Sequence, residues 1–181
     1  MSAPFELLVA IIIMGFVVII GSQMLTASQN QICRSGIDKE LTEFKSFLED
    51  TTQKKSTNKF TFIPEDICFN TSQATIRIAK YADTKICASK CPFSAGSCFV
   101  LMFSANLPNN QGGMLIEKCL NIPEYTNFTT SDECNTGSDL SSKGYKPINP
   151  GDDLPLGQYV LKSVSLIGQS YPSICVFYQK S

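Results

Sequence analysis

The cysteines are the residues of this chain whose side chains are most suited to chemistry. The chain has 181 residues, with eight cysteines and no histidine. A cysteine nucleophile needs a neighbouring base, and without histidine the usual base is missing. The sequence also has no glycine-rich phosphate loop and no recognisable pair of catalytic carboxylates. We therefore expect no catalytic residue, no cofactor and no enzyme activity.

Two spacings are loosely similar to metal sites. The series Cys87-x3-Cys91-x6-Cys98 lacks the matched close pairs, often joined by histidine, of structural zinc sites. The stretch 132–139 is spaced loosely like a calcium loop but lacks the closing glutamate. We expect no metal site and a disulfide framework in an oxidising compartment. The cysteines assigned to disulfides are Cys33, Cys68, Cys87, Cys91, Cys98, Cys119, Cys134 and Cys175.

One disulfide is predicted from a hairpin. Strands at 98–105 and 113–119 flank a turn centred near Asn109, which would place Cys98 opposite Cys119. Cys98–Cys119 is therefore the first predicted pair. Eight cysteines allow about 105 pairings, so the remaining links stay open.

Charge and sequons also bear on where the chain works. With 15 basic and 16 acidic residues and no basic tract, the chain has no electrostatic footprint for nucleic acid. Sequons at Asn70-Thr71-Ser72 and Asn127-Phe128-Thr129 predict glycosylation at Asn70 and Asn127. Glycans and disulfides both belong to an exported chain.

The segment Phe5–Leu25 is mostly apolar, and its one charged residue is Glu6. As a helix its 21 residues would measure about 31 Å, close to the hydrocarbon thickness of a bilayer. A cleaved signal peptide would need a basic start and a small-residue cleavage site, but no Lys or Arg precedes Arg34. A membrane anchor is the alternative. The positive charges that follow the span would then place the rest of the chain in the cytoplasm, whereas the cysteines place it outside.

Glu6 narrows the interpretation of this segment. In a single anchor, a carboxylate in the first turn is tolerated at the interface and near the positive end of the helix dipole. Inside a bundle of such helices it needs a cationic partner. A neighbouring copy's free α-amino group could be that partner. If the mature chain begins at Ser2, Glu6 is its fifth residue.

The stretch Ser2-Ala3-Pro4-Phe5-Glu6-Leu7-Leu8-Val9-Ala10-Ile11-Ile12-Ile13 resembles the mature N-terminus of type IV pilins and pilin-like proteins. The resemblance covers about 25 residues, and the rest of the chain carries no motif of that family. It implies a basic leader clipped on the cytoplasmic side, then a helix that serves first as membrane anchor and later as filament core. The absence of proline near position 22 favours the archaeal branch.

The resemblance also implies residue roles and partners. The partners would be identical subunits in a helical filament, the membrane before assembly, the pilus assembly machinery, and a surface or host receptor. The implied assembly residues are Glu6, Leu7, Leu8, Ile11, Ile12, Ile13, Phe16, Val17, Ile20 and Met24.

A helical period continues beyond the apolar run. Ile37, Leu41, Phe44 and Leu48 recur at spacings of four, three and four, with charged residues between them. This pattern predicts one helix over about residues 4–52 that packs on one side only in its second half. We expect three parts: a filament-core or transmembrane helix at 1–25, an amphipathic continuation and linker at 26–57, and a head at 58–181.

The head is predicted to be built from strands. Strand-like segments occur at 59–63, 75–79, 98–103, 114–116, 158–167 and 174–178, with proline and glycine between them. The segment 98–103 is apolar on both faces and should be central. Residues 121–156 are polar and predict a long surface loop tethered at Cys134. The fold class is α+β: a long N-terminal helix with a disulfide-rich antiparallel β-sheet or β-sandwich head.

These features predict a structural subunit of an extracellular type IV pilus-like filament, inserted in the membrane before assembly, with its head exposed for adhesion. One alternative is a monomeric, membrane-anchored ectodomain that binds a ligand or partner. Another is a minor pilin or a secretion pseudopilin, which would use the same helix in few copies.

Overall fold

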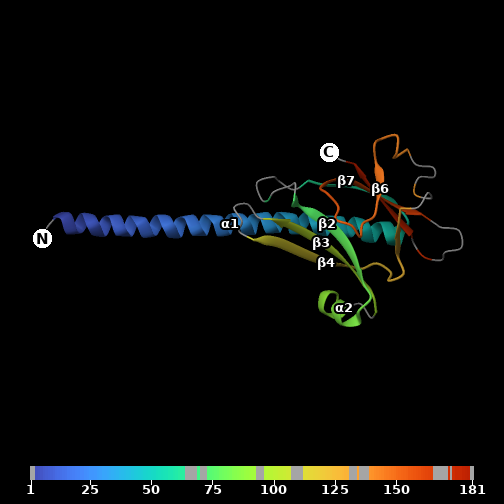
Figure 1. The fold of residues 1–181 in the computed structure, drawn as a ribbon, viewed down its shortest axis with the longest axis horizontal. Coiled ribbons are helices and arrows are strands. Elements are labelled where there is room, and N and C mark those ends of the chain that lie inside the picture. The colour runs from blue at the N-terminus through green and yellow to red at the C-terminus, as the bar shows by residue number, and fades with distance from the viewer. Residues whose placement is uncertain are drawn as a thin grey trace. The chain divides into compact units, whose positions relative to one another are not determined.

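The computed structural model describes residues 3–63, 69, 73–92, 96–106, 112–130, 134, 139–164, 171 and 173–179. The chain forms two compact units, Met1–Ile37 and Asp38–Ser181. The predicted boundaries at residues 25 and 57 stay predictions. In chain order the elements are α1 (Ala3–Lys54), β1 (Thr57–Phe62), β2 (Thr75–Tyr81), α2 (Thr84–Lys90), β3 (Cys98–Asn106), β4 (Gly113–Leu120), β5 (Asn127–Thr129), β6 (Lys146–Ile148), β7 (Gly157–Val164) and β8 (Ser173–Gln179) (Figure 1).

Helix α1 is a single helix of 52 residues, so the predicted long N-terminal helix is confirmed. Its one proline, Pro4, lies in the first turn, where the missing N–H has no helical partner to lose. The helix ends at Lys54, and the next residue, Lys55, has a left-handed φ of 52°. In the last turn the Thr51 hydroxyl donates to the carbonyl of Phe47 at 2.7 Å.

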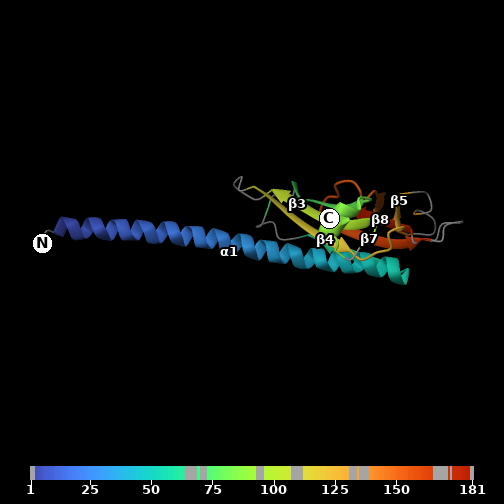
Figure 2. The ribbon, with the colours of Figure 1, turned by 90° about the horizontal axis from the view of Figure 1, so that it is seen from below.

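The second half of α1 carries the core stripe that the sequence predicts. Ile37, Leu41, Phe44 and Leu48 are all buried. Within the unit that begins at Asp38, the ring of Phe44 stacks on Phe60 of β1 at 4.9 Å between centroids. Figure 2 shows this part of α1 running along the strands. The helix therefore supplies one wall of the head's core.

The larger sheet has the strand order β1-β7-β8-β5, with β6 also paired to β8. Its pairs are antiparallel except β5 with β8, which is parallel. A Cβ on Gly157, at the start of β7, would lie 2.6 Å from a ring carbon of Tyr178 and 2.9 Å from the Gln179 carbonyl oxygen. A side chain at position 157 would therefore clash with β8, so glycine is required at the start of β7.

The smaller sheet is antiparallel, with the order β2-β3-β4. Strand β3 is central, and its residues 98–103 are all buried except the half-buried Met102, as the two apolar faces of this segment predict. The other predicted strand segments also overlap strands, although Ile63 of the segment predicted at 59–63 lies just beyond the end of β1. The residues 165–167 of the segment predicted at 158–167 and the turn at 107–111 lie outside the described residues.

Three short elements were not predicted. Helix α2 has seven residues, too few to show a helical period, and its N-cap Asp83 accepts a hydrogen bond from the amide of Lys85 at 2.7 Å. Strands β5 and β6 have three residues each and lie inside the stretch predicted to be one long loop. The loop prediction was wrong for these residues. Both strands pair with β8 through backbone hydrogen bonds, which side-chain composition does not reveal.

Candidate assembly site

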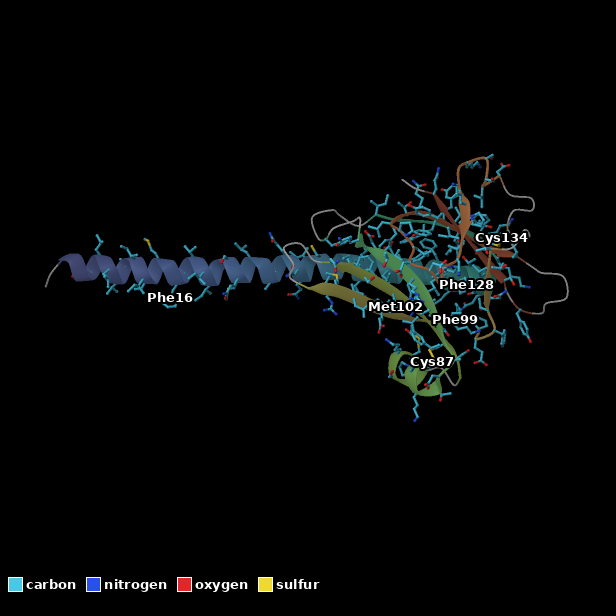
Figure 3. The ribbon with its side chains drawn as sticks, viewed as in Figure 1. Phe16, Cys87, Phe99, Met102, Phe128 and Cys134 are labelled. Carbon is cyan, nitrogen blue, oxygen red and sulfur yellow. A yellow bond between two sulfur atoms is a disulfide. The ribbon has the colours of Figure 1, made fainter. Side chains whose placement is uncertain are left out.

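The first half of α1 carries the largest apolar surface described in this chain. Its large side chains are exposed: Leu7 by 65%, Ile11 by 62% and Phe16 by 62% (Figure 3). Successive helical residues are about 100° apart, so the uninterrupted run from Ile11 to Met14 already points in every direction. The helix is long and apolar enough to cross a membrane by length and composition.

Polar side chains are few in the first half of α1. From Leu7 to Gly21 no side chain carries a polar group beyond the methionine sulfur. Ser22 follows, and its hydroxyl donates to the carbonyl of Ile19 at 2.8 Å. Such back-bonding suits a segment surrounded by lipid or by other helices, where water is absent.

The structure places all ten predicted assembly residues on this one helix, and the side chain of each is exposed. They surround the helix instead of sharing one face, so no single partner helix could cover them all. Sequence reasoning missed Ile32, which is 67% exposed beyond the apolar run. An isoleucine among glutamines, serines and asparagine was the signal that could have revealed it.

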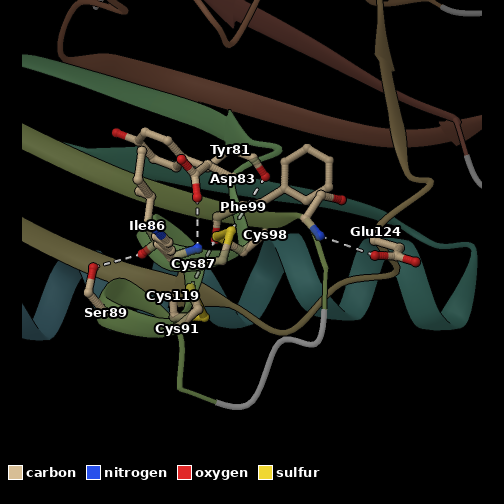
Figure 4. Close-up of a disulfide and its surroundings, with 12 residues drawn as sticks. Tyr81, Asp83, Ile86, Cys87, Ser89, Cys91, Cys98, Phe99, Cys119 and Glu124 are labelled. Carbon is tan, nitrogen blue, oxygen red and sulfur yellow. Dashed lines mark hydrogen bonds between the residues drawn. A yellow bond between two sulfur atoms is a disulfide. The ribbon is translucent and has the colours of Figure 1, made fainter.

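The predicted Cys98–Cys119 disulfide is wrong. The described disulfides are Cys87–Cys98, Cys91–Cys119 and Cys134–Cys175. The hairpin of β3 and β4 exists, but its register sets Val100 opposite Cys119, so Cys98 is two residues away along the strand. Cys98 instead binds Cys87 of the unpredicted helix α2, and Cys119 binds Cys91, the residue that caps the end of α2 (Figure 4).

Helix α2 is thus fixed to both strands of this hairpin. Cys87 and Cys91 are one helical turn apart and fully buried. Lys90 adds an ion pair to Glu117 of β4, with Nζ to Oε1 at 2.5 Å. The hydrogen bond to Glu117 raises the pKa of Lys90 above its ordinary value. Cys87, Cys91 and Cys98 are bonded in disulfides, so their sulfurs are not thiolates that could bind zinc in this structure.

The other predicted chemical residues are only partly described. Cys134 is buried with Tyr145, Val160 and Phe177, and its disulfide to Cys175 ties the 121–156 stretch to β8. The tether at Cys134 was predicted, but its partner was not. Cys33 is disulfide-bonded, whereas Cys68 lies outside the described residues.

Of the residues with calcium-like spacing, Asp132, Asn135 and Gly137 also lie outside the described residues. Asp139 forms an ion pair with Lys143, with 3.8 Å between Oδ2 and Nζ. Among the described residues, no cluster of His, Cys, Asp or Glu could hold a metal ion.

The two sequons also differ in what the structure describes. Asn127 is exposed at the start of β5, and the following Phe128 packs edge-on against Phe99 at 5.7 Å between centroids. Asn70 lies outside the described residues. An exposed asparagine is open to modification, but glycosylation at both positions stays a prediction.

Comparisons with protein-family models, with curated proteins and with solved structures found no significant match to this chain. Its cellular context therefore follows from its own features. The apolar N-terminal helix is of the kind that serves as a membrane anchor or signal. The disulfides indicate an oxidising, extracellular environment.

Proposed function

We propose that this chain is the structural subunit of an extracellular filament of the type IV pilus kind, with the archaeal branch favoured. The observation that carries the proposal is the apolar surface of α1, which is exposed on all sides from Leu7 to Leu25. Soluble monomers rarely expose contiguous apolar patches beyond a few hundred Å². Lipid would cover this surface before assembly, and neighbouring copies would cover it afterwards.

The energy available from covering this surface is large. Burying a half-exposed Leu, Ile, Val or Phe gains about 1–2 kcal/mol, and the segment Leu7–Leu25 holds many such side chains. The total is on the order of 20 kcal/mol before the cost of association is subtracted. Because the side chains surround the helix, this gain needs neighbours on several sides. That requirement favours a filament over a dimer.

Glu6 supplies the charge that a simple anchor would not need. It lies in the first turn of α1 and is exposed. In a bundle of parallel helices it would neutralise a neighbour's amino group, provided that the mature chain begins at Ser2. A docking subunit would then be guided by charge as well as by apolar burial.

The disulfide-linked head would be the part that meets the outside. Disulfides persist in an oxidising extracellular environment and would stabilise the head there. The polar stretch 121–156 would be the first candidate for contact with a surface or receptor. The assembly machinery would lift the apolar segment from the membrane into the polymer.

Mechanical shearing of intact cells tests the proposal. We expect this chain in the released material as long polymers that contain many copies. A monomeric ectodomain would instead remain with the membranes and dissolve in detergent as single molecules. A minor pilin or pseudopilin would be present in the sheared fraction only in trace amounts beside another, abundant subunit.

A further inference from the structure

Two charged residues stand alone in the first compact unit. Between Ala3 and Ile37 the sequence contains one acidic residue, Glu6, and one basic residue, Arg34. Both side chains are exposed on α1. In the part of the chain that the structure describes, neither residue takes part in an ion pair.

The helix prevents these two residues from pairing within one copy. They are 28 positions apart on α1, which separates them by about 42 Å along the helix axis. A bilayer with its headgroups is about 40–45 Å thick. In the membrane each charge can therefore reach water at its own interface, and neither needs a partner there.

Assembly changes this situation. Once the apolar helices leave the lipid and surround one another, a charge among them loses its water and is costly unless an opposite charge meets it. Between Ala3 and Ile37, the charged side chains that identical copies can offer one another are Glu6 and Arg34. We propose that Arg34 of one copy pairs with Glu6 of a second copy displaced by about 42 Å along a parallel helix.

This pairing rests on the proposed filament and gives it an axial register. The contact is head-to-tail: each copy uses Glu6 toward one neighbour and Arg34 toward another, so a free Glu6 and a free Arg34 remain at the two ends. Such heterologous contacts generate open-ended polymers instead of closed dimers. The parallel direction follows because all copies are inserted in the membrane in one orientation.

The helix around Arg34 leaves room for more than one neighbour. Ile32 is 67% exposed and points about 200° around the helix from Arg34, so it would contact a different copy from the one that Arg34 meets. The hydroxyl of Ser35 donates to the Ile32 carbonyl at 2.8 Å and is therefore engaged within its own helix. A Cβ built on Gly36 meets nothing within 4 Å, and Gly36 lies one turn from Ile32, so a helix can approach closely on that face. An arginine also binds a carboxylate through two parallel hydrogen bonds.

Two cationic partners for Glu6 are thus proposed: the N-terminal amino group of one neighbour and Arg34 of another. The pairing with Arg34 does not depend on where the mature chain begins. A carboxylate has two oxygens and can accept hydrogen bonds from both groups. The two contacts would therefore coexist, one near the first turn of a neighbour and the other near its residue 34.

A charge-swap series on the full-length chain tests the pairing. Arg34→Glu would place two carboxylates at the contact, and Glu6→Arg would place two guanidinium groups there. We expect each single reversal to lower the sheared polymer by at least about tenfold, and the double variant Glu6→Arg/Arg34→Glu to recover most of it. Lys39→Glu is the matched control, since Lys39 is exposed and has no described ion pair.

A chemical measurement keeps the test decisive if a reversal prevents membrane insertion. Arg34→Lys keeps the charge and supplies an amine that carbodiimide can couple to a touching carboxylate. In polymers of this variant we expect an amide cross-link between Glu6 and position 34 of different copies, detected by mass spectrometry. Cross-linking of membrane-inserted monomers should not give it.

The outcomes separate this pairing from the filament proposal. Normal polymers of Arg34→Glu, no recovery in an inserted double variant, or no cross-link in Arg34→Lys polymers would each overturn the pairing alone. A wild-type chain that never polymerises would overturn the filament and the pairing together.

Discussion

At the scale of single residues, Glu6 has the most specific proposed role. Its carboxylate is tolerated at a membrane interface but needs a cation when helices surround it. We expect Glu6→Ala to leave the amount of protein in the membrane unchanged, because the apolar segment is intact, and to slow or prevent polymer formation. Quantifying the chain in membrane and sheared fractions checks this. Filaments of normal yield from Glu6→Ala would contradict the charge-guided docking.

Tyr159 gives the head a dependence on alkaline pH. The residue is fully buried, its hydroxyl donates to the Pro155 carbonyl, and burial together with the charge of nearby Tyr178 raises its pKa above the ordinary range. An unfolded tyrosine ionises near pH 10, so above about that pH the unfolded state binds fewer protons than the folded state. The stability contribution of Tyr159 is therefore complete below about pH 10 and is lost as the pH rises.

We expect the free energy of unfolding to fall between pH 9.5 and 11 with a slope approaching about 1.4 kcal/mol per pH unit from Tyr159. Denaturant titrations across this range measure the slope. Tyr159→Phe should make the slope of unfolding free energy against pH smaller. Tyr171→Phe changes an exposed tyrosine and should leave the slope unchanged. An equal slope in the wild type and in Tyr159→Phe would exclude the effect. Tyr178 and Lys90 also have raised pKa values and contribute with the same sign.

At the scale of elements, helix α2 depends on its disulfides more than on its own sequence. Seven residues are too few for a stable isolated helix. The Cys91–Cys119 bond spans 28 residues, and removing such a closure costs about 3–4 kcal/mol. We expect the double variant Cys91→Ala/Cys119→Ala to lose about that much stability in denaturant unfolding. Its α2 amides should also exchange hydrogen faster.

Ser89→Ala provides the matched control on the same helix. Its hydroxyl bonds only to the Ile86 carbonyl on the exposed surface, so a change within about 0.5 kcal/mol is expected. If the double cysteine variant unfolds at the same denaturant concentration as the wild type, α2 is held by packing and not by its disulfides.

The elements also show what could be predicted from sequence and what could not. The stripe through Leu41, Phe44 and Leu48 and the doubly apolar β3 were predictable because burial imposes a period on the side chains. Helix α2 and its disulfides were not, since seven residues carry little periodic signal. A two-residue error in the β3–β4 register was enough to give the wrong partner for both Cys98 and Cys119.

At the candidate site, the ten assembly residues came from the resemblance to pilins, and their assembly role stays a prediction. The exposure of their side chains in the structure agrees with the apolar run in the sequence. Ile32 and Arg34 were missed as contacts because their exposure and their pairing cannot be judged from the sequence. Their meaning depends on the described burial and on the lack of an ion pair for Arg34 among the described residues. Both facts come from three-dimensional structure.

At the scale of the whole molecule, the apolar segment and the rest of the chain should be separable. A chain that starts at residue 26 keeps all eight cysteines but loses the apolar surface. We expect it to fold as a monomer that stays in solution without detergent, whereas the full-length chain should need detergent or polymerise. Light scattering after size-exclusion chromatography measures both. Polymers from the shortened chain would show that assembly does not need residues 1–25.

The two disulfide groups have a mechanical consequence. One group joins residues 87 to 98 and 91 to 119, and the other joins 134 to 175, so the chain between these points cannot be drawn out while the bonds hold. An extended residue spans about 3.3–3.6 Å, so these loops withhold well over 200 Å of slack from a pulled subunit. A filament of such subunits would therefore not lengthen under tension by unfolding of these loops, and the pulling force would be transmitted along it to the cell.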